Sequence, residues 1–304
     1  MNKYQVWLHA CRLRTLPLAA SSIIVAGGLA KHYQVFDMGI FLLSLLTALL
    51  LQILSNLAND YGDAVTGADE QRVGPQRMMQ SGLISKVAMQ KAIIFVTFAC
   101  ILSGLSLLVR SFGDDLQHWL VFIGLGIVAI VAAITYTMGK IPYGYRAMGD
   151  VAVFLFFGLL GVLGSFYLQA LTLPVEILLP AFSIGFLSAA VLNINNMRDL
   201  VNDKTANKIT LVVLFGRQNA FVYHLLLIIS AMLCSVLYIY ALPGSQFWQF
   251  LFLLIASPLI KSCTQIYIAL NDFENESAIF NEQLKNTAIS TFVFSLLFSI
   301  VLIT

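Results

Sequence analysis

The chain has 304 residues, of which 59% are hydrophobic and only 11% are charged, and its formal net charge is +2. Soluble globular domains carry roughly 25% charged residues. The composition therefore excludes an ordinary water-soluble domain and is typical of a protein embedded in a membrane.

Nine apolar runs along the chain are each long enough to cross a bilayer as a helix, which takes about 20 residues. A membrane β-barrel is excluded because these runs are long and unbroken rather than short and alternating. We therefore expect an all-α, multi-pass bundle in which residues 1–304 form a single domain. The predicted spans are about 15–31, 39–58, 91–109, 118–137, 148–169, 174–195, 218–241, 246–270 and 287–304.

The distribution of Lys and Arg predicts the orientation. If successive connections alternate between the two sides, Lys31 and Arg110 lie on one side and all the remaining Lys and Arg, of 17 in total, lie on the other. The positive-inside rule then places the N-terminus in the cytoplasm. The two long polar connections, about 59–90 and 196–217, share this side, so we expect the functional site to face the cytoplasm.

The first polar cluster, NLANDYGDAVTGAD, follows the second apolar run. Asn59 and Asp63 are four residues apart and therefore share one face of a helix. Asn56 and Asp60 adjoin that face, and a turn after the helix would bring Asp69 back toward it. One acidic residue at a helix end is ordinary, but a cluster of this density is unusual in a chain with 15 acidic residues.

The second cluster, NINNMRDLVNDKTANK, follows the sixth apolar run, and its Asn195, Asp199 and Asp203 again recur every four residues. Carboxylates gathered beside lipid repel one another and are costly, and a hard divalent cation removes that cost. Mg²⁺ binds through a few carboxylates together with substrate phosphates and waters. We predict that the two clusters hold Mg²⁺ and a diphosphate; the alternative is that they only cap helix ends in water. The predicted metal ligands are Asn59, Asp60, Asp63, Asp69, Asn195, Asp199 and Asp203.

Basic and polar residues near the two clusters are candidates for contacting the diphosphate. Arg suits bidentate contact with phosphate and Lys suits a point-charge contact, although the positive-inside rule alone would also place them here. Three residues, Asp63, Asp199 and Lys140, are predicted to act in catalysis. The predicted substrate-binding residues are Asn56, Arg72, Arg77, Lys140, Tyr143, Arg146, Arg198 and Lys208.

These motifs resemble those of a known family, the UbiA-type intramembrane aromatic prenyltransferases. The stretch NDYGDAVTGAD is similar to the family's NDxxD-type signature, and Asp199-Leu-Val-Asn-Asp203 is similar to its DxxxD signature. The stretches RLRTLPLA, RVGPQRMMQSG and GKIPYGYRAMGDVAVFLFFG add a closer resemblance to the branch that uses 1,4-dihydroxy-2-naphthoate. One departure is Asn207, where the family often has Gly, and Asn is tolerated there if its backbone is left-handed.

The resemblance implies Mg²⁺-dependent transfer of a long polyprenyl chain, such as octaprenyl, from its diphosphate to 1,4-dihydroxy-2-naphthoate. CO₂ and diphosphate would leave, giving demethylmenaquinone for menaquinone biosynthesis. Four tyrosines lie near the clusters in the sequence: Tyr61, Tyr136, Tyr143 and Tyr145. Their aromatic faces are expected either to shield the allylic cation that forms during transfer or to anchor the protein at the membrane interface. The resemblance also implies a bacterial cytoplasmic (inner) membrane, contact with membrane lipid and no nucleic-acid partner.

Three alternatives remain open at this point. A related prenyltransferase could act on 4-hydroxybenzoate, haem or a chlorophyll precursor. A secondary transporter would place acidic residues near helix midpoints, whereas here they lie at helix ends. A CDP-alcohol phosphotransferase would carry its Asp-Gly and Ala-Arg pairs in one continuous signature, which neither cluster does.

Overall fold

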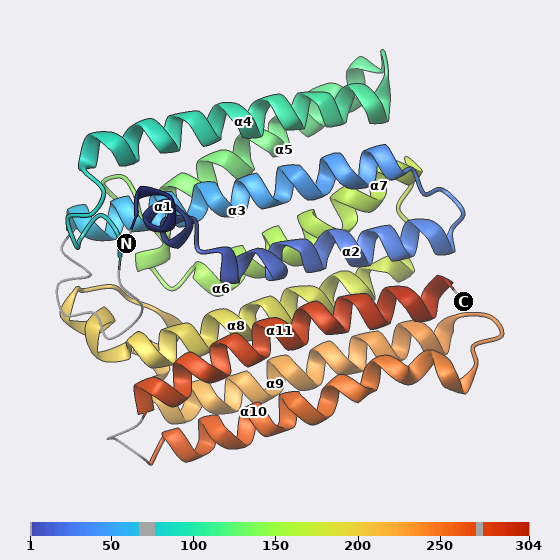
Figure 1. Cartoon of the computed structure of the whole chain (residues 1–304). Coiled ribbons are helices and arrows are strands. Elements are labelled where there is room, and N and C mark those ends of the chain that lie inside the picture. The colour runs from blue at the N-terminus through green and yellow to red at the C-terminus, as the bar shows by residue number, and fades with distance from the viewer. Residues whose placement is uncertain (1, 67–76, 272–275, 304) are drawn as a thin grey trace.

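The fold is a bundle of long helices (Figure 1), seen in a computed structural model that describes residues 2–66, 77–271 and 276–303. In those ranges the only strand-like pairing is an isolated parallel bridge between Arg146 and Ile209. The helical elements are α1 (Lys3–Cys11), η1 (Leu13–Thr15), α2 (Leu16–His32), α3 (Met38–Thr66), α4 (Lys86–Phe112), α5 (Leu116–Thr135), η2 (Tyr143–Tyr145), α6 (Gly149–Val153), η3 (Phe154–Gly164), α7 (Ser165–Ala170), η4 (Val175–Ile177), α8 (Leu178–Thr205), α9 (Leu211–Ala241), η5 (Phe247–Ile255), α10 (Ala256–Ala269) and α11 (Glu276–Ile303).

Nine helical segments within the described ranges are long and apolar enough to cross a membrane, which confirms the predicted number of spans. Several of them are formed by consecutive elements, such as α6, η3 and α7, where η3 is a π-helix. α3 and α8 continue well past their predicted ends at about 58 and 195, to Thr66 and Thr205. Asn59, Asp60 and Asp63 of the first cluster and Asn195, Asp199 and Asp203 of the second therefore lie on the last turns of helices.

The polar connections gather at one end of the bundle. Figure 1 shows α1, the ends of α3 and α8 and the beginning of α4 at the same end as the N-terminus, while the C-terminus lies at the opposite end. The termini lie at opposite ends, as an odd number of spans requires. At the C-terminal end, Arg110 of α4 pairs with Asp37 at 2.7 Å.

α8 is the most enclosed helix and packs against α9, η3 and α11. Small residues allow these helices to approach closely, as is common between helices in membranes. A Cβ on Gly158 of η3 would lie only 2.7 Å from the Ala181 carbonyl oxygen of α8. Likewise, a Cβ on Gly28 of α2 would lie 2.6 Å from the side chain of Ser299 on α11. The walls formed by these helices are thus fixed by backbone contact.

α4 and α5 form the more open side of the bundle. α3 packs along α4, but Ala129 is the only buried residue of α5. The outward side chains of both helices are apolar, as expected for a surface facing lipid.

Candidate functional site

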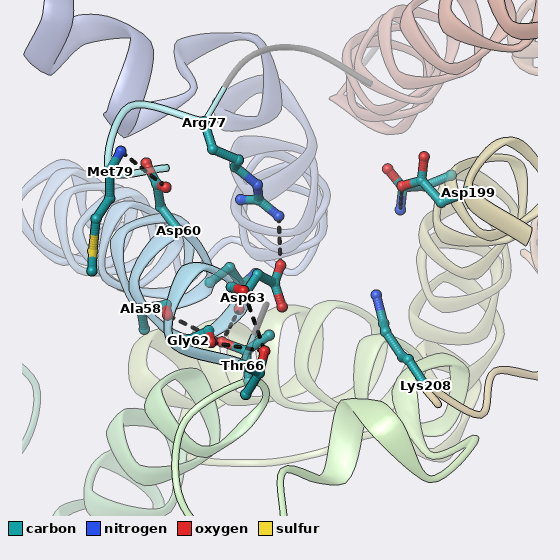
Figure 2. Close-up of polar contacts among 12 residues, drawn as sticks. Ala58, Asp60, Gly62, Asp63, Thr66, Arg77, Met79, Asp199 and Lys208 are labelled. Carbon is teal, nitrogen blue, oxygen red and sulfur yellow. Dashed lines mark hydrogen bonds and ion pairs between the residues drawn. The ribbon is translucent and has the colours of Figure 1, made fainter. Parts of the chain in front are cut away.

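The two acidic clusters face each other across a cavity of about 500 Å³. Asn59 and Asp63 line it from α3, Asn195 and Asp199 line it from α8, and Lys208 lines it from the segment after α8. In Figure 2 the side chains of Asp63, Asp199 and Lys208 point toward the same space. The structure therefore brings together residues more than 130 positions apart in the sequence.

Asp63 is buried and holds two partners. Its Oδ2 accepts a hydrogen bond from Arg77 Nη2 at 2.7 Å, and its Oδ1 accepts one from the Tyr145 hydroxyl at 2.9 Å. Burial and the Asp63 carboxylate raise the pKa of Tyr145 above its usual value, so the hydroxyl stays protonated and remains a donor. The carboxylate is fixed from two sides while it lines the cavity.

Asp199 is held by its own neighbour in the sequence. Arg198 contacts both carboxylate oxygens of Asp199, through Nε and Nη2 at 2.7 Å each. The same guanidinium donates to the Asn195 side-chain oxygen at 2.8 Å and to Asn281 Oδ1 at 2.9 Å. Arg198 is buried and does not line the cavity, so it supports Asp199 and Asn195 from behind.

Asp203 and Lys208 form a third pair. Lys208 Nζ lies 3.3 Å from Asp203 Oδ1 and 5.7 Å from the centre of the Tyr145 ring. Burial would lower the pKa of Lys208, but the carboxylates of Asp203 and Asp63 outweigh it and raise that pKa above its usual value. Lys208 therefore presents a permanent positive charge to the cavity.

Two loops meet beside the site and position these residues. The Ala147 N–H donates to the Ile209 carbonyl at 2.7 Å, and the Ile209 N–H donates to the Tyr145 carbonyl at 3.1 Å. Asn207 has a positive φ of 53°, so the condition under which Asn is tolerated at this position is met. Through these contacts, Tyr145 and Lys208 approach the two clusters from opposite loops.

The rest of the cavity is mainly apolar and runs away from the clusters along the bundle. On α3 its lining extends from Ser44 to Asp63, and at 1.5 Å per residue this corresponds to about 28 Å along the helix axis. Its walls come from α2, α3, α4, α5, η3 and α8. The cavity thus has a charged end, here called its head, and a long apolar part, here called its body.

The sequence profile of the UbiA prenyltransferase family matches residues 20–280. The chain belongs to the UbiA prenyltransferase family. It is 46% identical over 268 residues to the 1,4-dihydroxy-2-naphthoate octaprenyltransferase of Escherichia coli, covering 88% of this chain and 86% of that one. It is 44% identical over 269 residues to the enzyme of the same name from Haemophilus influenzae, covering 88% and 87%.

The fold is also that of solved UbiA proteins. A UbiA homolog from Archaeoglobus fulgidus bound to GPP and Mg²⁺ matches with a TM-score of 0.62 at 18% identity, over 98% of this chain and 99% of that chain. The family assignment argues against the transporter and CDP-alcohol phosphotransferase alternatives.

The donor atoms of this UbiA cavity suit a Mg²⁺ ion that is shared with a substrate. Within the described ranges, no three His, Cys, Asp or Glu side chains lie close enough to hold an ion by themselves. Mg²⁺ usually binds through only one or two carboxylates and completes its shell with waters and substrate phosphates. Asp203 Oδ2 is buried and has no hydrogen-bond partner in the part of the chain that the structure describes, so it is a carboxylate oxygen available to a cation.

Two predicted site residues on α3 do not reach the cavity. Asp60 accepts hydrogen bonds from the backbone N–H groups of Met78 and Met79 at 3.1 and 3.4 Å, and Figure 2 shows it pointing away from Asp199 and Lys208. Asn56 donates to the Cys11 carbonyl oxygen at 2.9 Å. In this structure both residues hold neighbouring segments against α3. The roles of Asp60 as a metal ligand and of Asn56 as a substrate-binding residue stay predictions.

Of the three site residues predicted in the 138–147 loop, one lines the cavity and two do not. Tyr143 lines the cavity, where its ring packs against Tyr136 at 5.3 Å between centroids. Lys140 and Arg146 are exposed and do not line the cavity, so the structure does not bring Lys140 to the catalytic position predicted for it. The predicted residues Asp69 and Arg72 lie outside the described residues.

Arg12, Thr15 and Thr137 also line the cavity, although the motifs did not single them out. Arg12 and Thr15 lie within the RLRTLPLA stretch that carried part of the resemblance. Thr137 donates to the Ala58 carbonyl oxygen and to Asn59 Oδ1, each at 3.1 Å. The sequence feature that could have indicated this contact is Gly62, because a glycine inside a helix often marks a close approach of another backbone segment. A Cβ on Gly62 would lie 2.6 Å from the Thr137 carbonyl oxygen.

Proposed function

We propose that this protein transfers a long polyprenyl group, such as octaprenyl, from its diphosphate to 1,4-dihydroxy-2-naphthoate. The products are CO₂, diphosphate and demethylmenaquinone in its reduced form. The observation that carries the proposal is one continuous cavity with Asp63, Asp199 and Lys208 at its head and a long apolar body. The relatives named 1,4-dihydroxy-2-naphthoate octaprenyltransferase, at 46% and 44% identity, support this choice of donor and acceptor.

In this proposal residues 1–304 act as one domain. The two acidic clusters bind the diphosphate group of the prenyl donor. Lys208 and Arg77 line the cavity beside the carboxylates and are placed to contact phosphate oxygens. Asp63, Asp199 and Asp203, with the side-chain oxygens of Asn59 and Asn195, are the residues that would hold Mg²⁺. When bound, Mg²⁺ neutralises the negative charge that develops on the diphosphate as it leaves.

The reaction exchanges one ring substituent for another. The bond between the first prenyl carbon and the diphosphate oxygen breaks, and the electrons of the naphthoate ring form a bond to that carbon at the position bearing the carboxylate. The bond to the carboxylate then breaks, and its electron pair returns to the ring as CO₂ leaves. Because no ring proton is removed, the reaction needs no general base at that carbon.

The chain's own residues would protect the allylic cation that forms as the diphosphate departs. Tyr136 and Tyr143 line the cavity next to the charged head and present aromatic faces, which stabilise cations. Burial raises the pKa of Tyr136 to about 12, so its hydroxyl remains neutral. The apolar walls exclude the water that would otherwise capture the cation.

The site end of the bundle is proposed to face the cytoplasm of a bacterial inner membrane. The support is the clustering of Lys and Arg at that end, with Lys31 and Arg110 at the other. The prenyl donor reaches the apolar body of the cavity from the lipid, and the water-soluble acceptor reaches the charged head from the cytoplasm.

An assay on membranes that contain the protein tests the function. The mixture holds Mg²⁺, octaprenyl diphosphate and either radiolabelled 1,4-dihydroxy-2-naphthoate or radiolabelled 4-hydroxybenzoate, with EDTA as the metal-free control. The expected result is a lipid product from the naphthoate alone, which EDTA abolishes. A product from 4-hydroxybenzoate alone would overturn the acceptor, and no product from either, with the protein verified in the membrane, would overturn the proposed function.

A further inference from the structure

Gln52 is a polar side chain of the cavity to which neither the metal nor the diphosphate assigns a role. It lines the cavity from α3, seven residues before Asn59, which corresponds to about 10 Å along the helix axis. Ser55 lines the cavity between these two residues. The residues of α4 and α5 in the lining are, by contrast, all apolar. α3 therefore gives the cavity a polar wall just beyond its head, a feature that a hydrocarbon tail does not require.

Hydrogen bonds to the neighbouring segment fix which way the Gln52 amide points. Asn56 Nδ2 donates to the Cys11 carbonyl oxygen at 2.9 Å, which leaves Asn56 Oδ1 as the atom that can accept. Gln52 Nε2 donates to this Oδ1 at 3.2 Å and to Thr15 Oγ1 at 3.3 Å. The Thr15 hydroxyl itself donates to the Arg12 carbonyl oxygen at 3.0 Å. Both N–H groups of the Gln52 amide therefore have partners, and their positions set its orientation.

The side-chain oxygen of Gln52 is what this network leaves over. Oε1 accepts no hydrogen bond within the part of the chain that the structure describes. An amide oxygen only accepts hydrogen bonds, so it attracts a donor and repels the oxygens of an ionised carboxylate or diphosphate. A prenyl tail has no O–H or N–H group. Among the substrates of the proposed function, the hydroxyl groups of the naphthoate ring are the ones that can donate to Oε1.

We propose that Gln52 Oε1 accepts a hydrogen bond from the hydroxyl at carbon 4 of the naphthoate and so selects the acceptor, an inference that rests on the proposed function. Carbon 2, where the new bond forms, must lie beside the diphosphate at Asn59 and Asp63. The hydroxyl at carbon 1 adjoins that reacting carbon, whereas the hydroxyl at carbon 4 is the more remote and can reach along α3 toward Gln52. An acceptor without it leaves Oε1 unpaired and binds more weakly.

Two compounds that differ only in this hydroxyl, 1,4-dihydroxy-2-naphthoate and 1-hydroxy-2-naphthoate, test the proposal. The measurements are the KM of the first and the competitive inhibition constant of the second, on membranes with saturating Mg²⁺ and octaprenyl diphosphate. Neither constant depends on how much of a variant is folded. The wild type is expected to bind the monohydroxy compound about tenfold more weakly, the effect of one missing hydrogen bond.

Gln52→Leu removes the accepting oxygen and should abolish this preference. It is expected to raise the KM of the dihydroxy compound by about tenfold, because a hydrogen bond of ordinary strength is lost. The inhibition constant of the monohydroxy compound and the KM of octaprenyl diphosphate should stay at their wild-type values. The matched control is Gln117→Leu, which removes the same amide from an exposed position on α5 outside the cavity lining. All three constants of this control should equal those of the wild type.

Three results would overturn the role of Gln52. They are equal binding of the two compounds by the wild type, equal weakening of both in Gln52→Leu, and a rise in the KM of octaprenyl diphosphate alone. A wild-type protein that prenylates neither naphthoate would instead overturn the proposed function.

Discussion

Asp63 and Asp199 are each paired with an arginine at 2.7 Å, but the two arginines are placed differently. Arg77 lines the cavity together with Asp63, whereas Arg198 lies behind Asp199 and is fixed by Asn281. Arg77 can therefore transfer its contact from the carboxylate to a phosphate oxygen. Arg198 keeps Asp199 and Asn195 in position and is a positioning residue.

Replacing either cavity carboxylate should abolish transfer. Asp63→Ala and Asp199→Ala each remove a proposed Mg²⁺ ligand and leave a buried arginine without its partner, so turnover is expected to fall by about a hundredfold or more. The measurement is the initial rate of the purified variant at saturating Mg²⁺, together with its thermal unfolding midpoint in detergent. The control is Asp37→Ala, which breaks an Asp–Arg pair at the opposite end of the bundle. Near-normal turnover in either cavity variant would contradict the two-cluster site.

Asn207 offers a test of the loop that presents Lys208. Its φ of 53° suits Gly and is strained for a β-branched side chain by about 1–2 kcal/mol. Asn207→Gly is expected to retain full activity, while Asn207→Val should lower both the unfolding midpoint and kcat/KM for the diphosphate. Equal activity and stability in the two variants would show that this turn does not position Lys208.

The site was predictable where chemistry and helical spacing coincide, and less so where partners come from distant segments. The pairing of Asp63 with Asp199 across one space follows from two similar clusters at the same membrane face. The orientation of Asp60 does not, because it depends on backbone N–H groups of Met78 and Met79 in a connecting segment. The exposed position of Lys140 away from the cavity lining could not be predicted either, because cytoplasmic loops carry Lys whether or not a substrate binds there.

At the scale of elements, continuous apolar runs were sufficient to predict nine spans, since a helix is the only way to satisfy the backbone of such a run in lipid. Hydropathy did not reveal where α3 and α8 end, because their last turns are polar and yet remain helical. It also gave no sign of the π-helix η3, whose backbone passes within contact distance of α8 at Gly158 and Gly185.

Adding one methyl group at Gly62 should disturb the contact between α3 and Thr137, in the segment after α5. A Cβ on Gly62 would lie 2.6 Å from the Thr137 carbonyl oxygen, so Gly62→Ala must shift the backbone beside Asn59 and Asp63. Overpacking of this kind costs about 1–3 kcal/mol, and activity should fall with stability. The matched control is Gly124→Ala on α5, where a Cβ meets nothing within 4 Å and the change should be neutral or stabilising. Thermal unfolding of both variants in detergent decides the point, and equal midpoints would contradict the close contact.

At the scale of the whole molecule, the charged head of the cavity lies at one end of the bundle, so membrane orientation decides from which side it is reached. Cysteine labelling tests that orientation in a background with the native Cys11, Cys100, Cys234 and Cys263 replaced. Asp114→Cys, in the exposed turn between α4 and α5, is expected to react with a membrane-impermeant thiol reagent in cells whose outer membrane alone is permeabilised. Lys140→Cys, exposed at the other end, is expected to react only after the inner membrane is opened. The reverse pattern would place the site on the outer side.

The three carboxylate–cation pairs at and beside the head of the cavity mean that the resting protein carries its own counter-ions. Asp63, Asp199 and Asp203 each already contact a basic side chain. In the proposed function, the arrival of a metal–diphosphate complex would therefore be a partner exchange, in which carboxylates turn to the metal and Arg77 and Lys208 turn to phosphate. A site neutralised in this way projects little long-range field, so its rate of substrate capture should depend only weakly on ionic strength. Such a site can remain folded between turnovers without a bound ion to hold its acids apart.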